Sequence, residues 1–184
     1  MNTDLIQLLL EHARSRYFGK HRGKVTDNQD PTTRGRLKVS VPSVLADLEV
    51  WAMPCVPYAG DGVGLMSLPA ADAGVWVEFE GGDPSYPIWV GCFWADGEAP
   101  DSGNPDIKIW KTPEHTVRLD DAAKEMKLST SGPATITLTD EVKTEAGGAT
   151  HTVGADGVVS ELSPNKVEVT STSVKVNDGA LEVA

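Results

Sequence analysis

The residue types that most often carry catalysis or bind metals are few and scattered in this chain. No HxH, HExxH or CxxC spacing is present. The four histidines are His12, His21, His115 and His151. The pair Glu114-His115 lies near Asp120-Asp121 and could form an acid–base set, but a turn with solvated charges explains the same residues. We therefore expect no enzyme, with no catalytic residue, no metal ligand and no cofactor.

Two other segments resemble functional loops without having their key residues. Residues 60–64, GDGVG, lack the lysine and the Ser/Thr of a phosphate loop, and 177–179, NDG, are turn residues rather than a calcium loop. Cys55 and Cys92 lie in apolar, strand-like runs. We expect two buried free thiols, with a disulfide as the alternative.

Charge is distributed unevenly along the 184 residues. The net charge is −11, yet half of the Lys and Arg residues lie between Arg14 and Lys38, and none lies from Val39 to Ile107. The overall charge argues against a nucleic-acid partner. A basic edge beside an acidic surface suits an assembly contact, although the charges could equally pair within the fold. Without a membrane-length apolar stretch or a signal-like N-terminus, we expect synthesis in the cytoplasm.

The stretch 74–94 has the clearest strand pattern and organises the first half of the chain. Val75, Val77 and Phe79 alternate with polar or exposed positions, which predicts a half-buried strand. Residues 87–93 hold no charge, which predicts a strand buried on both faces. The glycine-rich segment 81–84 between them predicts a tight turn, so the two strands form a closing hairpin.

Other periodic segments complete a small barrel. Residues 4–16 form an amphipathic helix whose apolar stripe packs either on its own barrel or on a neighbouring chain. Strands are expected around 20–26, 34–41 and 49–56, and residues 58–73 form a loop, with room for one helical turn. Five strands, with a long loop before the fourth strand, match an OB-type barrel.

Beyond a breaker-rich linker at 95–106, short apolar–polar–apolar runs recur through 107–184. The runs include 107–109, 117–119, 126–128 and 136–138. Three further runs, 167–169, 174–176 and 181–183, start at intervals of seven residues. Such repeats cannot bury their apolar side alone, and three chains wound into a β-prism of about nine or ten strands would cover it. The candidate trimer-core residues are Val117, Leu119, Met126, Leu128, Ile136, Leu138, Val167, Val169, Val174, Val176, Leu181 and Val183.

Residues 19–94 also carry a set of short motifs that are typical of one protein family. Their positions are Gly23 and Val25; Gly35, Arg36, Val39, Val41 and Pro42; Trp51; and Gly74, Val77, Phe79, Gly82, Asp83, Pro87 and Gly91. With these motifs the segment resembles the OB domain of phage baseplate assembly protein V. It is also similar to the central spike domain of VgrG-like proteins in contractile injection systems.

The resemblance implies a homotrimeric spike in a virion tail baseplate or an injection-system particle. Such a spike plugs the inner tube, is docked by a tube-end hub protein at its N-terminal and OB side, and contacts the target membrane transiently when the sheath contracts. Only the linker stands where some relatives carry a lysozyme domain, so we expect no cell-wall hydrolysis. The chain ends GALEVA without an HxH apex, so we expect a separate PAAR-type tip protein.

The expected fold is therefore mainly β. It comprises an N-terminal helix in 1–18, a five-stranded OB barrel in 19–94, the linker in 95–106 and an intertwined trimeric β-helix or β-prism in 107–184. A different class of protein remains the alternative: a monomeric OB-fold module that binds an oligonucleotide or a protein, with a β-rich tail.

Overall fold

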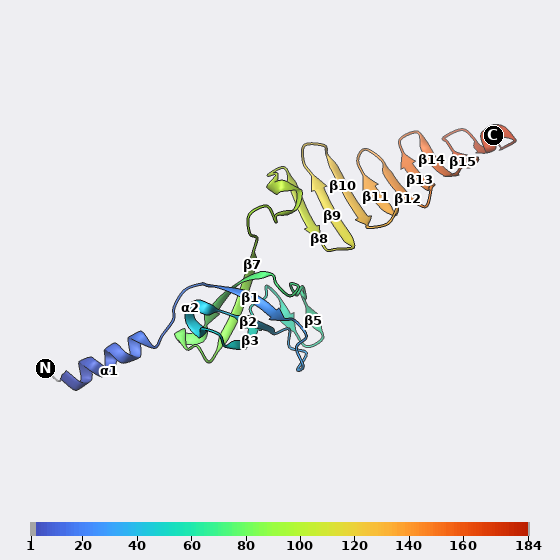
Figure 1. The fold of residues 1–184 in the computed structure, drawn as a ribbon. Helices are drawn as coiled ribbons and strands as arrows, with labels where there is room; N and C mark the ends of the chain where they lie inside the picture. The colour runs from blue at the N-terminus through green and yellow to red at the C-terminus, as the bar shows by residue number, and fades with distance from the viewer. Residues whose placement is uncertain (1–2, 184) are drawn as a thin grey trace. The chain divides into compact units, whose positions relative to one another are not determined.

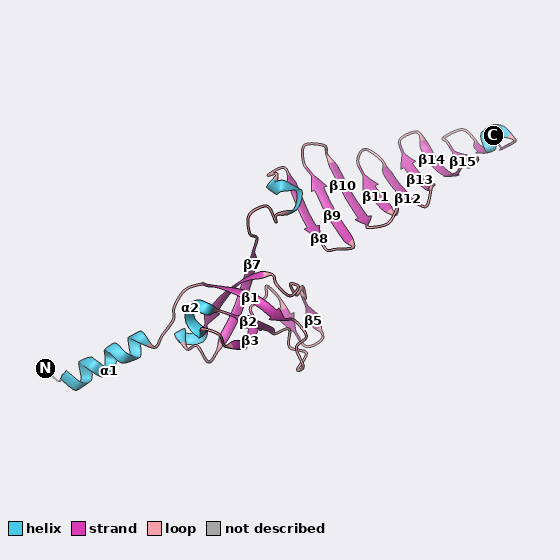
Figure 2. Ribbon diagram, in the orientation of Figure 1, coloured by secondary structure: helices cyan, strands magenta, loops and turns pink. Residues whose placement is uncertain are grey.

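The computed structural model describes residues 3–183, which divide into two units at the boundary between Glu98 and Ala99. The first unit holds a closed five-stranded barrel and the second a ten-stranded antiparallel sheet. Figures 1 and 2 draw both units as ribbons. The chain is mainly β with a short N-terminal helix, which confirms the expected fold class at this level.

The barrel has the strand order of an OB fold. Its neighbours run β1-β2-β3-β7-β6, and the pairing of β1 with β6 closes the ring. Only β3 and β7 are parallel. The elements of this unit are α1 (Thr3–Arg14), β1 (His21–Asp27), β2 (Leu37–Ser40), α2 (Pro42–Leu45), β3 (Glu49–Pro54), β4 (Ala59–Gly60), β5 (Val63–Gly64), β6 (Gly74–Phe79) and β7 (Pro87–Phe93).

The barrel interior is the hydrophobic core of this unit. The alternation expected in β6 is confirmed, since Val75, Val77 and Phe79 are buried. The strand β7 is not buried on both faces as expected, because alternate residues face outward, where no second layer covers them within the unit. The core residues are Val25, Leu37, Val39, Val41, Ala52, Val75, Val77, Phe79 and Trp89.

The turn between β6 and β7 uses its glycines as expected. Residues Glu80–Gly82 form a single 3-10 turn in which Gly81 and Gly82 have φ of 57° and 76°. Both values lie in the left-handed region that side chains penalise. A Cβ on Gly82 would also lie 3.0 Å from the ring of Phe18, so two constraints require glycine there.

Three features of the first unit differ from the sequence expectations. The loop 58–73 contains the small hairpin β4–β5 rather than a helical turn, and the short helix α2 was not foreseen. Both cysteines are free, but Cys55 and Cys92 are exposed, so the expected burial is wrong. A register shift between Trp76 and Val77 disturbs the pairing of β6 with the far half of β7, where Cys92 lies.

The helix α1 ends at Arg14, two residues earlier than expected, and its apolar side chains are exposed. Leu5, Leu8 and Leu9 are 54%, 62% and 59% exposed. The side-chain amide of Gln7 donates to Glu11 across one turn, at 3.2 Å. Among residues 3–183, no helix is long and apolar enough to cross a membrane.

The second unit is one antiparallel meander in which each strand pairs with the next along the chain (Figure 2). Its 3-10 turns are Pro100–Gly103 and Asn177–Gly179. Its strands are β8 (Ile107–Lys111), β9 (His115–Asp120), β10 (Glu125–Thr130), β11 (Thr135–Leu138), β12 (Val142–Ala146), β13 (Ala149–Gly154), β14 (Gly157–Leu162), β15 (Asn165–Val169), β16 (Val174–Val176) and β17 (Leu181–Val183).

Candidate functional site

One face of the ten-stranded sheet is apolar along nearly its whole length, and we call it the apolar face. Residues paired directly across an antiparallel ladder share a face, so the register between the strands defines rows of neighbouring side chains. The first row contains Lys108, Leu119, Met126, Leu138, Val142, Val153, Val158, Val169, Val174 and Val183. Nine of these ten residues are apolar.

A second row runs beside the first on the same face. Its members are Trp110, Val117, Leu128, Ile136, Thr144, His151, Ser160, Val167, Val176 and Leu181. The structure thus places all twelve candidate trimer-core residues on the apolar face, six in each row.

The apolar face is open in the single chain. Leu119, Val153 and Leu181, taken from its two ends and middle, are 41%, 41% and 61% exposed. Among the described residues, every fully buried hydrophobic side chain belongs to the barrel and none to the ten-stranded sheet. The sheet therefore has an apolar surface but no core of its own.

Sequence reasoning missed some members of this face and misplaced others. Trp110, Val142, Val153 and Val158 belong to the two rows, but the alternation around them is interrupted by polar residues and glycines. The two isoleucines of the run 107–109 lie on the other face of the sheet. Ile109 pairs with Arg118, which alternates with Val117 and Leu119 and so faces away from them. A single run of three residues does not reveal which side of a sheet it faces.

The opposite face is polar and carries ion pairs within single strands and between strands and nearby turns. Arg118 lies 2.9 Å from Asp120 and 3.0 Å from Asp101, and these carboxylates, Asp101 first, raise the pKa of its guanidinium. Lys166 lies 3.4 Å from Glu168 and 3.3 Å from Asp178, and its pKa is raised by the hydrogen bond to Asp178 first. The ten-stranded sheet thus has one polar face suited to contact with water and one apolar face that is not.

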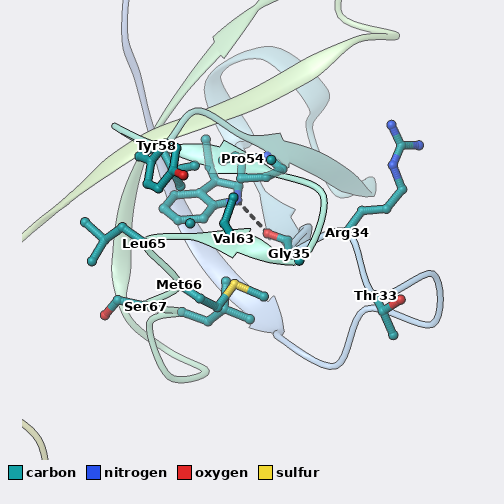
Figure 3. A pocket seen from close by; sticks show the side chains of 16 residues that line it. Thr33, Arg34, Gly35, Pro54, Tyr58, Val63, Leu65, Met66 and Ser67 are labelled. Atoms are coloured by element: carbon teal, nitrogen blue, oxygen red, sulfur yellow. Dashed lines mark hydrogen bonds between the residues drawn. The ribbon is translucent and has the colours of Figure 1, made fainter.

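The barrel carries a separate pocket beneath the hairpin β4–β5 (Figure 3). Its volume is about 460 Å³, and the indole of Trp89 lies at its wall, donating to the carbonyl of Gly35 at 3.2 Å. Tyr58 and Met66 also line it and are 59% and 66% exposed. In Figure 3 the side chain of Arg34 extends away from the pocket, so the lining is mainly apolar.

Trp76 and Trp89 are packing residues of the barrel. Trp76 packs against Phe93 with ring centroids 5.0 Å apart, and the guanidinium of Arg22 lies 4.9 Å and 4.8 Å from the two rings. Trp89 is 5% exposed, whereas Trp94, which follows β7, is 68% exposed.

The acid–base set that the sequence offers is not assembled. His115 and Asp120 lie five positions apart on β9 and therefore face opposite sides of the sheet. The carboxylate of Asp120 instead accepts from the backbone of Ala123 and from Arg118, which lower its pKa. Within residues 3–183 of one chain, no three His, Cys, Asp or Glu side chains cluster as metal ligands.

The first unit is thus a closed barrel of OB order, and the second is a meander with one apolar face. Residues 21–94 match the family described as the type VI secretion system/phage-baseplate injector OB domain. This match identifies residues 21–94 as an OB domain of the baseplate-injector family and supports a baseplate-associated structural role for the protein. No curated protein matches the chain.

Proposed function

We propose that this chain is the central spike of a contractile tail or injection machine. As a homotrimer it plugs the inner tube and punctures the envelope of the target cell when the sheath contracts. The family of residues 21–94 supports the setting. The observation that carries the proposal is the exposed apolar face of the ten-stranded sheet.

Three copies are the economical way to cover this face. A single sheet layer has to bury its apolar side against another layer, and a continuous apolar patch of this size is rare on a monomer. In a three-sided prism each chain supplies one wall, with its apolar face inward and its ion-paired face in water. Each Val or Leu taken from full exposure to full burial would contribute about 1.5–3 kcal/mol before ordering costs.

A prism of this kind suits a mechanical task. Its walls are held by continuous backbone hydrogen bonds, and closure around an axis removes lateral edges that would otherwise invite aggregation. Force from sheath contraction would pass along the stacked strands. The role requires no catalytic group, and the acid–base set of the sequence is not assembled.

The partners follow from the two ends of such a spike. A tube-end hub protein would dock at the N-terminal and barrel side, where the apolar residues of α1 are exposed. A PAAR-type tip protein would cap the end formed by β17, the last strand of the meander. Contact with the target membrane would be transient, and the net charge of −11 gives no support for a nucleic-acid partner.

The oligomeric state of the purified full chain tests the proposal. Sedimentation equilibrium or native mass spectrometry should give a trimer, and a stable monomer at micromolar concentration would overturn the proposal. Ile136→Asp should abolish the trimer, because Ile136 lies between Leu128 and Thr144 on the apolar face.

The matched control is Thr137→Asp, one residue further along β11. Thr137 faces the other side and pairs with Lys127 and Lys143, so a new carboxylate there meets two ammonium groups. This variant should remain trimeric. If both variants lose the trimer equally, or neither does, the apolar face is not the trimer core.

The pocket beneath β4–β5 favours a second candidate, a monomeric OB module that binds a protein ligand. Its apolar lining and exposed Tyr58 and Met66 could hold an apolar side chain of a partner. The same sedimentation experiment separates the two functions, since this candidate requires a monomer whose ligand affinity depends on Met66.

A further inference from the structure

Near the middle of the apolar face, three polar side chains lie side by side. Thr144 pairs with His151 across β12 and β13, and His151 pairs with Ser160 across β13 and β14. All three belong to the second row of the face. Along that row, Ile136 precedes them and Val167 follows them, so the polar group stands between apolar residues.

The polar group is also flanked by apolar residues on both sides. On one side lie three valines of the first row, Val142, Val153 and Val158. On the other side lie Ala146, Ala149 and Leu162, which are near the strand ends. A polar group enclosed in this way is costly to bury unless each of its polar atoms finds a partner.

His151 is the central residue of the group and is already held at one nitrogen. Its Nδ1 lies 2.7 Å from the Oγ of Ser160. Its Nε2 has no hydrogen-bond partner among the residues that the structure describes. The strand β13 places three residues on the apolar face, and His151 is the middle one, with Ala149 and Val153 on either side. His151 therefore projects from the centre of the sheet.

We propose that three His151 side chains, one from each copy, bind a divalent transition-metal cation such as Zn²⁺ on the axis of the spike. The proposal rests on the trimer proposed above. A three-fold axis necessarily brings the three copies of a residue to the same height. Because His151 lies at the middle of its strand, it is the polar side chain of this group best placed to reach that axis.

The donor set has the chemistry that the cation requires. Imidazole nitrogen suits zinc, copper and nickel, and three histidines with one further position form a known zinc ligand set. A histidine ligand usually has its other ring nitrogen held by a second group, which fixes its orientation; here Ser160 is that group. With Nδ1–H donating to Ser160, three Nε2 lone pairs would face one another in apolar surroundings, and a cation satisfies all three.

The ligands of this site would come from three copies of the chain. No HxH or CxxC spacing therefore accompanies them, and no cluster of metal ligands forms within residues 3–183 of the single chain. Of the other histidines, His21 packs within the barrel against Tyr17 and Phe79. His115 lies on the apolar face, but at the first position of β9, where it pairs with Thr130.

The test uses the full chain, stripped of metal by a chelator and then titrated with ZnCl₂ by calorimetry. We expect roughly one Zn²⁺ for every three chains, as a His₃ site requires. His151→Asn should abolish this binding, whereas the control His115→Asn should retain it. Ser160→Ala should weaken binding about 10–100-fold, because the second-shell hydroxyl is lost.

Native mass spectrometry of the same samples separates this proposal from the trimer itself. A metal-free trimer that binds no Zn²⁺, Ni²⁺ or Co²⁺ overturns the metal site and leaves the spike proposal standing, with the polar group serving the strand register only. Binding of one Zn²⁺ per chain, or binding retained in His151→Asn, also overturns the site. A monomer overturns both. Should His151→Asn fail to fold, the Co²⁺ absorption spectrum of the unaltered trimer reports whether nitrogen ligands hold the metal.

Discussion

The carboxylate of Asp30 is clamped by Arg36 at the entry to β2. Its Oδ1 accepts from Nε and an Nη of Arg36 at 3.0 Å and 2.8 Å, and its Oδ2 accepts from the backbone of Arg34 at 2.8 Å. The Asp30 side chain is 3% exposed. The guanidinium in turn lies 5.3 Å from the ring centroid of Trp51, so one acidic residue connects the loop before β2 to β3.

Replacing this carboxylate should destabilise the barrel and change its response to acid. The hydrogen bonds from Arg36 hold the pKa of Asp30 well below its usual range. Its contribution to stability is thus present above the unfolded-state pKa of about 3.9 and is lost as the pH falls through the lower folded-state pKa. Asp30→Asn should lower the melting temperature at neutral pH and flatten the acid limb of the stability curve. Thermal unfolding followed by tryptophan fluorescence across this pH range measures both effects.

The control for this variant is Asp61→Asn, at an exposed position between β4 and β5. It should leave both the melting temperature and the acid limb unchanged. Equal effects of the two substitutions would show that the clamp does not stabilise the barrel.

The barrel core should respond to truncation as a closely packed interior does. Leu37 on β2 is fully buried, so Leu37→Ala should lower the free energy of unfolding of the barrel by about 2–5 kcal/mol. Leu48 is 67% exposed, and Leu48→Ala should change the free energy of unfolding by less than about 0.5 kcal/mol. Denaturant unfolding followed by tryptophan fluorescence measures both. Similar losses for the two variants would contradict the assignment of the core.

The turn between β13 and β14 should tolerate only glycine at position 157. Gly157 has φ of 140°, and a Cβ there would lie 2.1 Å from the carbonyl oxygen of Val169 on β15. Gly157→Ala should therefore disturb the pairing of β14 with β15 and cost at least about 1–3 kcal/mol from backbone strain alone. Hydrogen exchange of the amides in these strands gives a local readout.

Gly132 in the same sheet provides the matched comparison. A Cβ there would meet only the hydroxyl of Thr130, at an ordinary contact distance of 3.6 Å. Gly132→Ala should leave hydrogen exchange in β14 and β15 unchanged, and fast exchange in both variants would argue against a specific role for Gly157.

The two cysteines should both react in the native protein, but at different rates. Both are free and exposed, while partial desolvation raises the pKa of the Cys92 thiol. Less thiolate is then present at a given pH, so alkylation of Cys92 should be slower than that of Cys55. Mass spectrometry of the variants Cys55→Ser and Cys92→Ser during iodoacetamide treatment separates the two rates. A disulfide in the untreated protein, or faster modification of Cys92, would contradict this assignment.

Local patterns in the sequence were sufficient to predict most of the barrel. The alternation of Val75, Val77 and Phe79 predicted β6, and the glycines after it predicted the turn, because both depend only on residues close together in the chain. The burial of β7 was predicted wrongly, since a run without charge does not reveal whether a second layer covers its outer face. The exposure of Cys92 depends in the same way on a register shift against another strand.

The ten-stranded sheet shows the same division between local and tertiary information. By itself the sequence determined that the twelve apolar residues alternate with polar ones, since alternation is a property of each short strand. Only the tertiary structure decided that these residues form two continuous rows, and that Thr144, His151 and Ser160 meet in one of them. The physical reason is that the register between strands is set by backbone pairing and turn geometry across the whole sheet. A shift of one residue in any strand would move its side chains to the other face.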